Sequence, residues 1–164
     1  MSVRDKLCGL PEECFSGEGL VIREIRDDGD LWYATVECAL APGQEDFVNP
    51  AGFAIGRAYL HPEANVPCVI CLESGERIGF MIFRDWLGAG TAYSWSYYLD
   101  KDWQGRGYGK SAARLAVRIL KAADQAMPIK LSTEQANEKA QRLYGSIGFR
   151  KLDELDGDDL VFGL

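Results

Sequence analysis

The chain lacks the features that would place it in a membrane or on a nucleic acid. It has no apolar run of membrane-spanning length, and its first residues, MSVRDKLCGLPEECF, scatter charges without the sustained apolar core of a secretory signal. It has no basic excess either, since 18 Lys and Arg stand against 25 Asp and Glu for a net charge of −7. Nucleic-acid binding usually needs a basic patch. We therefore expect a cytoplasmic protein with neither a membrane nor a nucleic-acid partner.

Metal-ligating residues are also scarce. His61 is the single histidine, and among five cysteines only Cys68 and Cys71 have the Cys-x-x-Cys spacing of zinc and redox sites. A zinc site needs further ligands, and no second pair with this spacing exists. The flanking VPCVICLE is typical of an apolar strand, in which residues three apart point to opposite faces. We therefore expect buried or half-buried free thiols and no metal, in a reducing compartment.

What is present suits one folded domain. The 164 residues are 47% hydrophobic and 26% charged, which is enough for one good-sized core, and there are no repeats or low-complexity linkers. We therefore predict a single domain over residues 1–164. The element order that the patterns predict is β-α-α-β-β-β-α-β-α-β-β. This order favours an α+β fold with a mixed, mostly antiparallel central sheet flanked by helices.

Hydrophobic periodicity and turn residues divide the chain into elements. Strands are predicted over 19–26, 65–73, 77–86, 91–100 and 129–133, with a final hairpin over 150–164. Helices are predicted over 31–40, 53–60, 110–126 and 137–147, with a loop over 41–52. Asp30 is the expected N-cap of the first helix, and Gly148 is the expected C-cap of the last.

The segment LDKDWQGRGYGK, between the aromatic strand and the alanine-rich helix, carries Gly105, Gly107 and Gly109. A helix N-terminus presents unpaired N–H groups and partial positive charge, and glycines remove the Cβ atoms that would obstruct a bulky anion. Strand, glycine-rich turn and helix therefore make a phosphate cradle. The spacing is neither that of a P-loop nor that of a dinucleotide fingerprint. Taken alone, the segment leaves a plain turn equally open.

A second motif changes this balance, because the two together resemble the GCN5-related N-acetyltransferase superfamily. The first motif, Q/R-x-x-G-x-G/A, runs from Gln104 to Gly109 after a strand ending YYLD. The second, N-x-x-A-x-x-L-Y-x-x-x-G-F, runs from Asn137 to Phe149. The resemblance covers nearly the whole chain and is weakest before residue 65. Within the superfamily the sequence looks most like bacterial polyamine (spermine/spermidine) acetyltransferases.

The resemblance implies acetyl-CoA as the cofactor. Its pyrophosphate would lie on the amides of the turn, and its pantetheine arm would pair with the end of the aromatic strand, which in this family splays from the next strand. Gly107 and Gly109 hold the motif positions, whereas Gly105 would only ease the turn. The cofactor-binding residues implied are Tyr98, Leu99, Gln104, Gly105, Arg106, Gly107, Tyr108, Gly109, Lys110, Asn137 and Tyr144. Arg106 or Lys110 would either approach a CoA phosphate or stay solvated.

The implied reaction is attack of a neutral amine on the thioester. Tyr144 occupies the family's general-acid position, and its reference pKa of about 10 keeps it protonated at neutral pH. The alternative role for Tyr144 is a core aromatic. Many relatives carry a carboxylate in the aromatic strand, which here has none before Asp100. The base is therefore open among Glu134, Asp28, Asp85 and a water chain.

Acidic balance and abundant aromatics favour a cationic substrate, because aromatic faces attract ammonium groups. We expect a polyamine or similar small amine, with Asp28, Asp85 and Trp95 as candidate contacts. Two alternatives stay open, namely acetylation of a protein N-terminus or lysine, and a non-catalytic acyl-CoA-binding module. Aromatic rings on a sheet also form cores and interfaces between two copies of a chain, which leaves a homodimer open.

Overall fold

Two antiparallel sheets lie at the centre of the computed structural model, which describes residues 1–164. The larger sheet has the order β1-β2-β3-β4-β5: β1 (Ser16–Gly17), β2 (Leu20–Glu24), β3 (Asn65–Leu72), β4 (Arg77–Asp85) and β5 (Tyr93–Leu99). The smaller has the order β6-β8-β7: β6 (Lys130–Thr133), β7 (Arg150–Asp156) and β8 (Asp159–Gly163). One parallel bridge, between Tyr93 and Ile129, joins them. The predicted α+β class with a mostly antiparallel sheet is confirmed.

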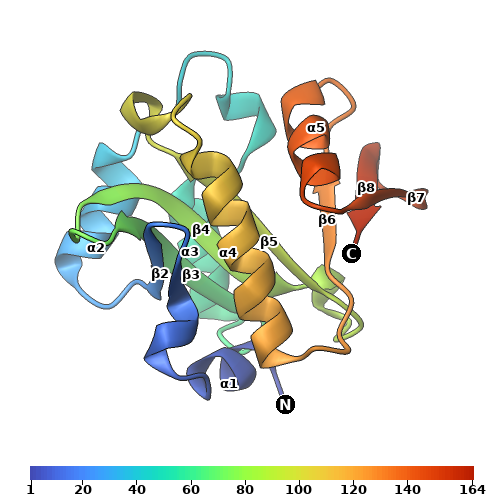
Figure 1. The fold of residues 1–164 in the computed structure, drawn as a ribbon, viewed down its shortest axis with the longest axis horizontal. Coiled ribbons are helices and arrows are strands. Elements are labelled where there is room, and N and C mark those ends of the chain that lie inside the picture. Colours follow the sequence, from blue (N-terminus) through green and yellow to red (C-terminus); the bar gives the residue numbers. More distant parts are fainter.

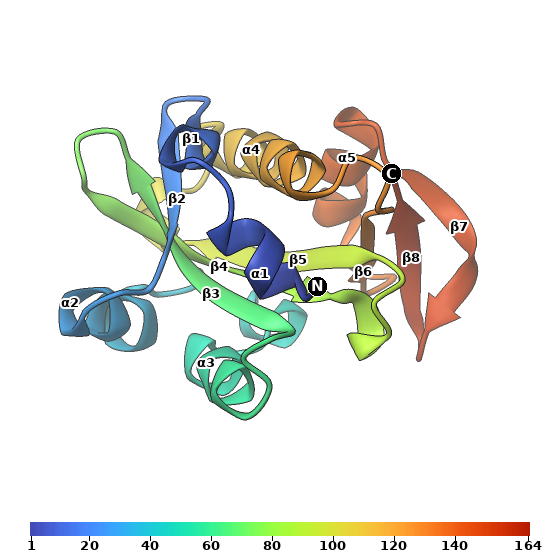
Figure 2. The same ribbon diagram turned by 90° about the horizontal axis from the view of Figure 1, so that it is seen from below.

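Five α-helices accompany the sheets: α1 (Val3–Cys8), α2 (Asp28–Trp32), α3 (Ala51–Leu60), α4 (Tyr108–Ala123) and α5 (Glu138–Ser146). A π-helical turn over Tyr33–Glu37 continues α2. Figure 2 shows α4 on one face of the larger sheet and α2 and α3 on the other. None of these helices combines the length and the apolarity that crossing a bilayer requires.

The main core lies between the larger sheet and α4. Strand alternation turns Cys68 and Ile70 toward this core, while Val69 and Cys71 face the opposite side and pack with Tyr33. Both thiols are free and buried, as predicted. Burial raises the pKa of the Cys68 thiol, which keeps it protonated and unreactive.

The beginning of the chain differs from the prediction. Helix α1 and strand β1 are too short for hydrophobic periodicity to reveal, and neither was predicted. Asp30 is not a helix cap. Helix α2 begins three residues earlier than expected, because the Asp27 carboxylate accepts a hydrogen bond from the Asp30 amide at 2.8 Å. Asp27 satisfies an orphan N–H of the first turn in the manner expected of an N-cap.

Asp30 instead forms the most buried charge cluster of the fold. Its side chain is fully buried and forms ion pairs with Arg23 of β2 and Arg77 of β4, the latter at 2.8 Å. The Arg26 amide donates a further bond to it. Burial raises the pKa of Asp30, but the hydrogen bonds from Arg23 and Arg77 outweigh burial and hold the pKa below its usual value. This carboxylate joins α2 to two strands.

The variant Asp30→Asn should therefore lower the free energy of unfolding by about 3 kcal/mol, because it removes the buried carboxylate with which Arg23 and Arg77 both pair and leaves Arg77 only the longer contact with Asp27, at 3.8 Å. The contribution of Asp30 is complete above the ordinary aspartate pKa and is lost as pH falls through the lower folded-state pKa. Urea unfolding across pH 2–7 measures both effects, so the gap between wild type and variant should close in acid. Asp153→Asn, at an exposed carboxylate without an ion pair, is the control. Equal losses in the two variants would contradict this account.

Candidate active site

Strands β5 and β6 separate immediately after their single bridge. The Tyr93 amide donates to the Pro128 carbonyl at 2.8 Å, and from Ser94 onward β6 provides β5 with no partner. Figure 1 shows β6, β7, β8 and α5 set to one side of α4 and β5. A strand edge inside a fold needs hydrogen-bond partners for its N–H and C=O groups. The splay expected from the family resemblance is therefore present, and it leaves an edge suited to an extended amide-bearing ligand.

The chain leaving β5 is braced by two polar side chains. Asp100 accepts hydrogen bonds from the amides of Asp102, at 3.0 Å, and Ala39, at 2.9 Å. Gln104 donates to the Leu99 carbonyl at 3.0 Å and to the Gln44 side chain at 2.8 Å. The predicted cofactor residue Gln104 thus holds the turn in shape. Its side chain is committed to the protein itself.

The amides of residues 105–110, called the anion nest below, donate to no acceptor within the chain. Gly105 and Gly107 adopt left-handed backbone, with φ of 74° and 88°, and a Cβ on either would meet no atom within 4 Å. Their need for glycine is therefore conformational, and the space above them is open. Gly109 differs, because it is helical and its carbonyl accepts from the Tyr97 hydroxyl at 2.8 Å.

These positions refine the sequence-based expectation. Gly105 was expected only to ease the turn, yet it has the same left-handed backbone as Gly107. Successive free amides at the start of a 16-residue helix are the kind of donor set that binds an anion.

Two cations flank the anion nest. The Arg106 guanidinium lies over the Trp103 ring, 4.8 Å from its centroid, and this ring packs in turn on Tyr108 at 5.8 Å. The stacked arrangement holds the positive charge beside the nest. Lys110 is half-buried on the first turn of α4. Neither cation forms an ion pair with a carboxylate of the chain, so both charges are available to a bound phosphate.

Tyr144 lies on α5 with a ring that is 9% exposed and packs against Phe149 and Phe162, at 6.0 and 5.9 Å between centroids. Its hydroxyl has no hydrogen-bond partner in the chain. Burial raises the pKa of Tyr144 to about 12. The phenol is therefore protonated at neutral pH, and its proton is not engaged elsewhere. Tyr97, by contrast, already donates to Gly109.

The junction between β6 and α5 holds two more predicted residues. The Asn137 side-chain oxygen caps α5 by accepting from the Ala140 amide at 3.2 Å, and its NH₂ group has no partner. Glu134 is half-buried, and its carboxylate forms neither an ion pair nor a hydrogen bond. Both residues therefore keep polar groups free beside the strand that faces the edge of β5.

The three predicted substrate residues are not brought together. Trp95 is 2% exposed and packs edge-on against Phe149 at 5.7 Å, because alternate residues of β5 face the core under α4. Asp28 is exposed on α2. Asp85 is half-buried at the end of β4, where burial raises its pKa. None of the three lines the pocket beside β5.

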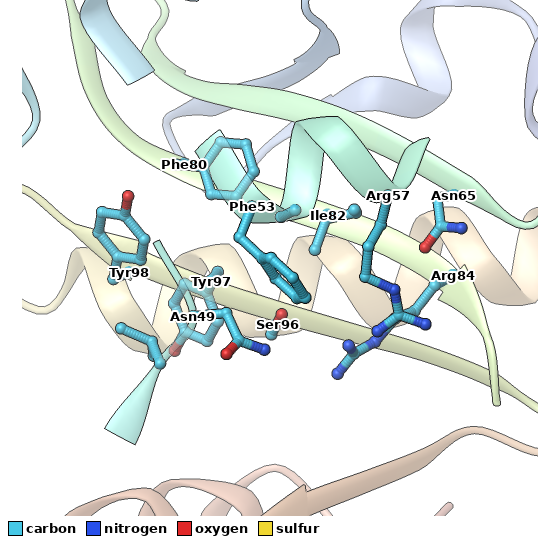
Figure 3. Close-up of a pocket in the computed structure, with 12 residues that line it drawn as sticks. Asn49, Phe53, Arg57, Asn65, Phe80, Ile82, Arg84, Ser96, Tyr97 and Tyr98 are labelled. Carbon is cyan, nitrogen blue, oxygen red and sulfur yellow. The ribbon is translucent and has the colours of Figure 1, made fainter. Parts of the chain in front are cut away.

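That pocket lies on the other face of the sheet, between α3 and strands β4 and β5 (Figure 3). Polar side chains along it are Asn49, Arg57, Asn65, Arg84 and Ser96, with Phe53, Phe80 and Ile82 as apolar wall. The sequence reasoning missed this site. The available signal was the pair Arg84 and Ser96, polar residues inside otherwise apolar or aromatic strands.

Comparisons with known proteins agree with the site geometry described above. A family model described as the acetyltransferase (GNAT) family matches residues 30–149. No curated protein sequence matches the chain. Among solved structures, AAC(6')-Ib in complex with ribostamycin and coenzyme A is similar at a TM-score of 0.71 and 19% identity, covering 89% of this chain and 92% of that one.

Two further solved structures share the fold. Spermidine N-acetyltransferase from Vibrio cholerae, in complex with CoA and spermine, has a TM-score of 0.70 and 16% identity, covering 90% of this chain and 94% of that one. An acetyltransferase from Agrobacterium tumefaciens str. C58 has a TM-score of 0.70 and 19% identity, covering 91% and 92%. At these identities the likeness concerns the fold.

Replacing Gly107 should separate cofactor binding from folding. In Gly107→Val the left-handed backbone becomes strained and a branched side chain enters the anion nest, so the Kd for CoA should rise at least tenfold. Gly75→Val is a matched control, since Gly75 has a φ of 93° and equally open surroundings in the β3–β4 turn. Calorimetric titration with CoA measures affinity, and thermal melts measure the shared cost of strain. Equal affinity in both variants would rule out the nest as the phosphate site.

Proposed function

The chain belongs to the acetyltransferase (GNAT) family, whose members are acetyl-CoA-dependent N-acetyltransferases, and from this premise we propose that its acceptor is the primary amine of a small molecule. The observation that carries the proposal is that three unpartnered groups lie on connected parts of the fold. The free amides of residues 105–110 and the unpaired edge of β5 lie in continuous chain, and the free hydroxyl of Tyr144 belongs to the unit that splays from that edge.

The residues present fit acetyl-CoA. The anion nest would take the pyrophosphate, with Arg106 and Lys110 supplying positive charge. The free backbone edge near Tyr98 and Leu99 would pair with amides of the pantetheine arm, and the free NH₂ group of Asn137 would donate to it from the other side. When bound, acetyl-CoA supplies a thioester whose acetyl carbon is open to attack by an amine.

Tyr144 is proposed as the general acid. The thiolate leaving group resembles that of cysteine, whose pKa is about 8.5. The Tyr144 phenol has the higher pKa, about 12, so it holds its proton until negative charge develops on the sulfur, and it then donates through a short hydrogen bond. The absence of any other partner for this hydroxyl supports the assignment.

Glu134 is proposed as the group that receives the amine proton, directly or through water. Its carboxylate lacks any ion pair or hydrogen bond that would compete for it. It also stands at the same junction as Asn137, at the end of the strand facing β5. Asp28 is exposed on α2 and Asp85 lies at the far end of β4, so neither has comparable support.

The pocket between α3, β4 and β5 is called the acceptor pocket below, and its border with α3 supports a small amine over a protein N-terminus or lysine. A peptide needs an open groove in which its backbone can pair, whereas here Phe53 and Arg57 of α3 line the pocket opposite β4 and β5. The solved spermidine N-acetyltransferase supports a polyamine within this class. The charge of the pocket argues for a different small amine, which is taken up in the next subsection.

The activity is tested with a panel of small amines, diamines, amino acids and short peptides, followed by release of free thiol from acetyl-CoA. We expect turnover with at least one small amine and none with peptides. A CoA-dependent rise in melting temperature without turnover of any amine would leave only the non-catalytic binding module. Preferential turnover of peptides would favour the protein acetyltransferase instead.

Tyr144→Phe should lower kcat about 100-fold and leave the Kd for CoA unchanged, because it removes a proton donor without removing packing volume. The melting temperature should also stay unchanged, since the hydroxyl has no partner to lose. Tyr59→Phe, at an 86% exposed tyrosine on α3, is the control. Steady-state kinetics on the best amine of the panel measures the effect. A kcat within twofold of wild type would exclude Tyr144 as the general acid.

A further inference from the structure

The acceptor pocket contains two arginines that face one another. Arg57 reaches in from α3 and Arg84 from β4, and Figure 3 shows their guanidinium groups adjacent. Neither group forms an ion pair or a side-chain hydrogen bond within the chain. Burial lowers the pKa of Arg84, and the positive charge of Arg57 lowers it further. Two like charges held together destabilise a fold unless something compensates them. The carboxylate of Asp156 acts on Arg84 and raises its pKa, but it forms no ion pair with it and does not line the pocket.

The two arginines do not lie together because the chain is short of acidic residues. The chain has 25 Asp and Glu against 18 Lys and Arg, and several of its arginines do have carboxylate partners. Arg4 pairs with Glu24, and both Arg23 and Arg77 pair with Asp30. Yet no Asp or Glu lines the acceptor pocket. The pocket is thus a positively charged site in an acidic protein, and its missing counter-charge is the feature to explain.

The surroundings of the arginines are those of a built binding site. Asn49 and Ser96 line the pocket as further hydrogen-bonding groups, and Phe80 and Ile82 form an apolar wall beside them. Tyr98, on the strand with the free edge, also lines it. Burial raises the pKa of the Tyr144 phenol, and the positive charge of Arg84 offsets part of that rise. Arg84 therefore links the pocket to the neighbourhood of the proposed proton donor, which does not itself line the pocket.

We propose that the acceptor amine also carries an oxyanion, which Arg57 and Arg84 bind while the amino group lies toward Tyr144. This inference rests on the proposed acetyl transfer to a small amine. Guanidinium forks match the planar geometry of a carboxylate with paired hydrogen bonds, and they also bind phosphate. A polyamine would instead place a second ammonium against the two guanidinium groups, where repulsion disfavours it.

The test compares acceptors that share one skeleton and differ only at the end remote from the amine. An ω-amino carboxylate, its neutral amide, the matching aminophosphonate and the matching diamine form such a series, prepared in several chain lengths alongside α-amino acids and their amides. Thiol release from acetyl-CoA gives kcat/KM for each. We expect the carboxylate or the phosphonate to exceed the amide and the diamine by about 10- to 100-fold, and the better of the two identifies the oxyanion.

Variants tie this preference to the arginines. Arg84→Gln and Arg57→Gln should each lower the ratio of kcat/KM between oxyanion and amide by about tenfold or more, acting on KM for the acceptor and leaving KM for acetyl-CoA unchanged. Arg150→Gln, at an exposed arginine of β7 without an ion pair, is the matched control and should preserve the ratio. Arg84→Glu should shift the preference toward the diamine. Melting temperatures identify any variant that fails to fold. If the Arg84 variants fail to fold, the Arg57 variant still tests the inference, because Arg57 is exposed on α3.

The two proposals fail in different ways. Turnover of amines without preference for an oxyanion, or a preference that survives both glutamine variants, overturns the present inference and leaves acetyl transfer standing. A preference for diamines overturns it in favour of a polyamine. No turnover of any amine overturns acetyl transfer to small amines, and the present inference with it.

Discussion

The separation of β5 from β6 is the constraint on which the rest of the site depends. After one bridge at Tyr93 the two strands diverge, and an edge that neighbouring strands would satisfy stays free. The same divergence leaves Tyr144, on the helix after β6, with an unpartnered hydroxyl. Because β5 runs directly into the anion nest, a ligand that pairs with its edge also delivers its phosphates to free amides. The separation of β5 from β6 thus provides both the surface on which a ligand binds and the direction in which the ligand lies.

The sequence revealed those parts of the site that depend on local backbone requirements. Gly107 needs a left-handed backbone, and the segment from Asn137 to Phe149 combines a cap with a helical stripe, so each leaves a pattern within a few residues. The burial of a side chain and the face of the sheet to which it points could not be predicted from such local patterns. Trp95 lies inside the core because α4 covers its face of β5. Asp30 is not the helix cap that the sequence predicts, because it pairs with two arginines from strands distant in the sequence.

The pair of Arg57 and Arg84 shows a second limit of sequence reasoning. Net charge describes the whole surface, and together with the abundant aromatics it favours a cationic substrate. The field inside a pocket depends on the few groups that line it, and here those are two guanidinium groups without a carboxylate. Residues that meet only through packing of α3 on β4 leave no spacing signal. The overall acidity of the chain and the positive charge of its pocket are compatible, because opposite charges gather in different places.

Hydrogen–deuterium exchange in the presence and absence of CoA tests the central claim most directly, because it reports on the same amides that the fold leaves free. The account predicts that CoA slows exchange in peptides covering residues 94–110, where the β5 edge and the anion nest lie, and much less in the β3–β4 turn around Gly75. Saturating CoA that left exchange over 94–110 unchanged, or that protected a different segment instead, would contradict it.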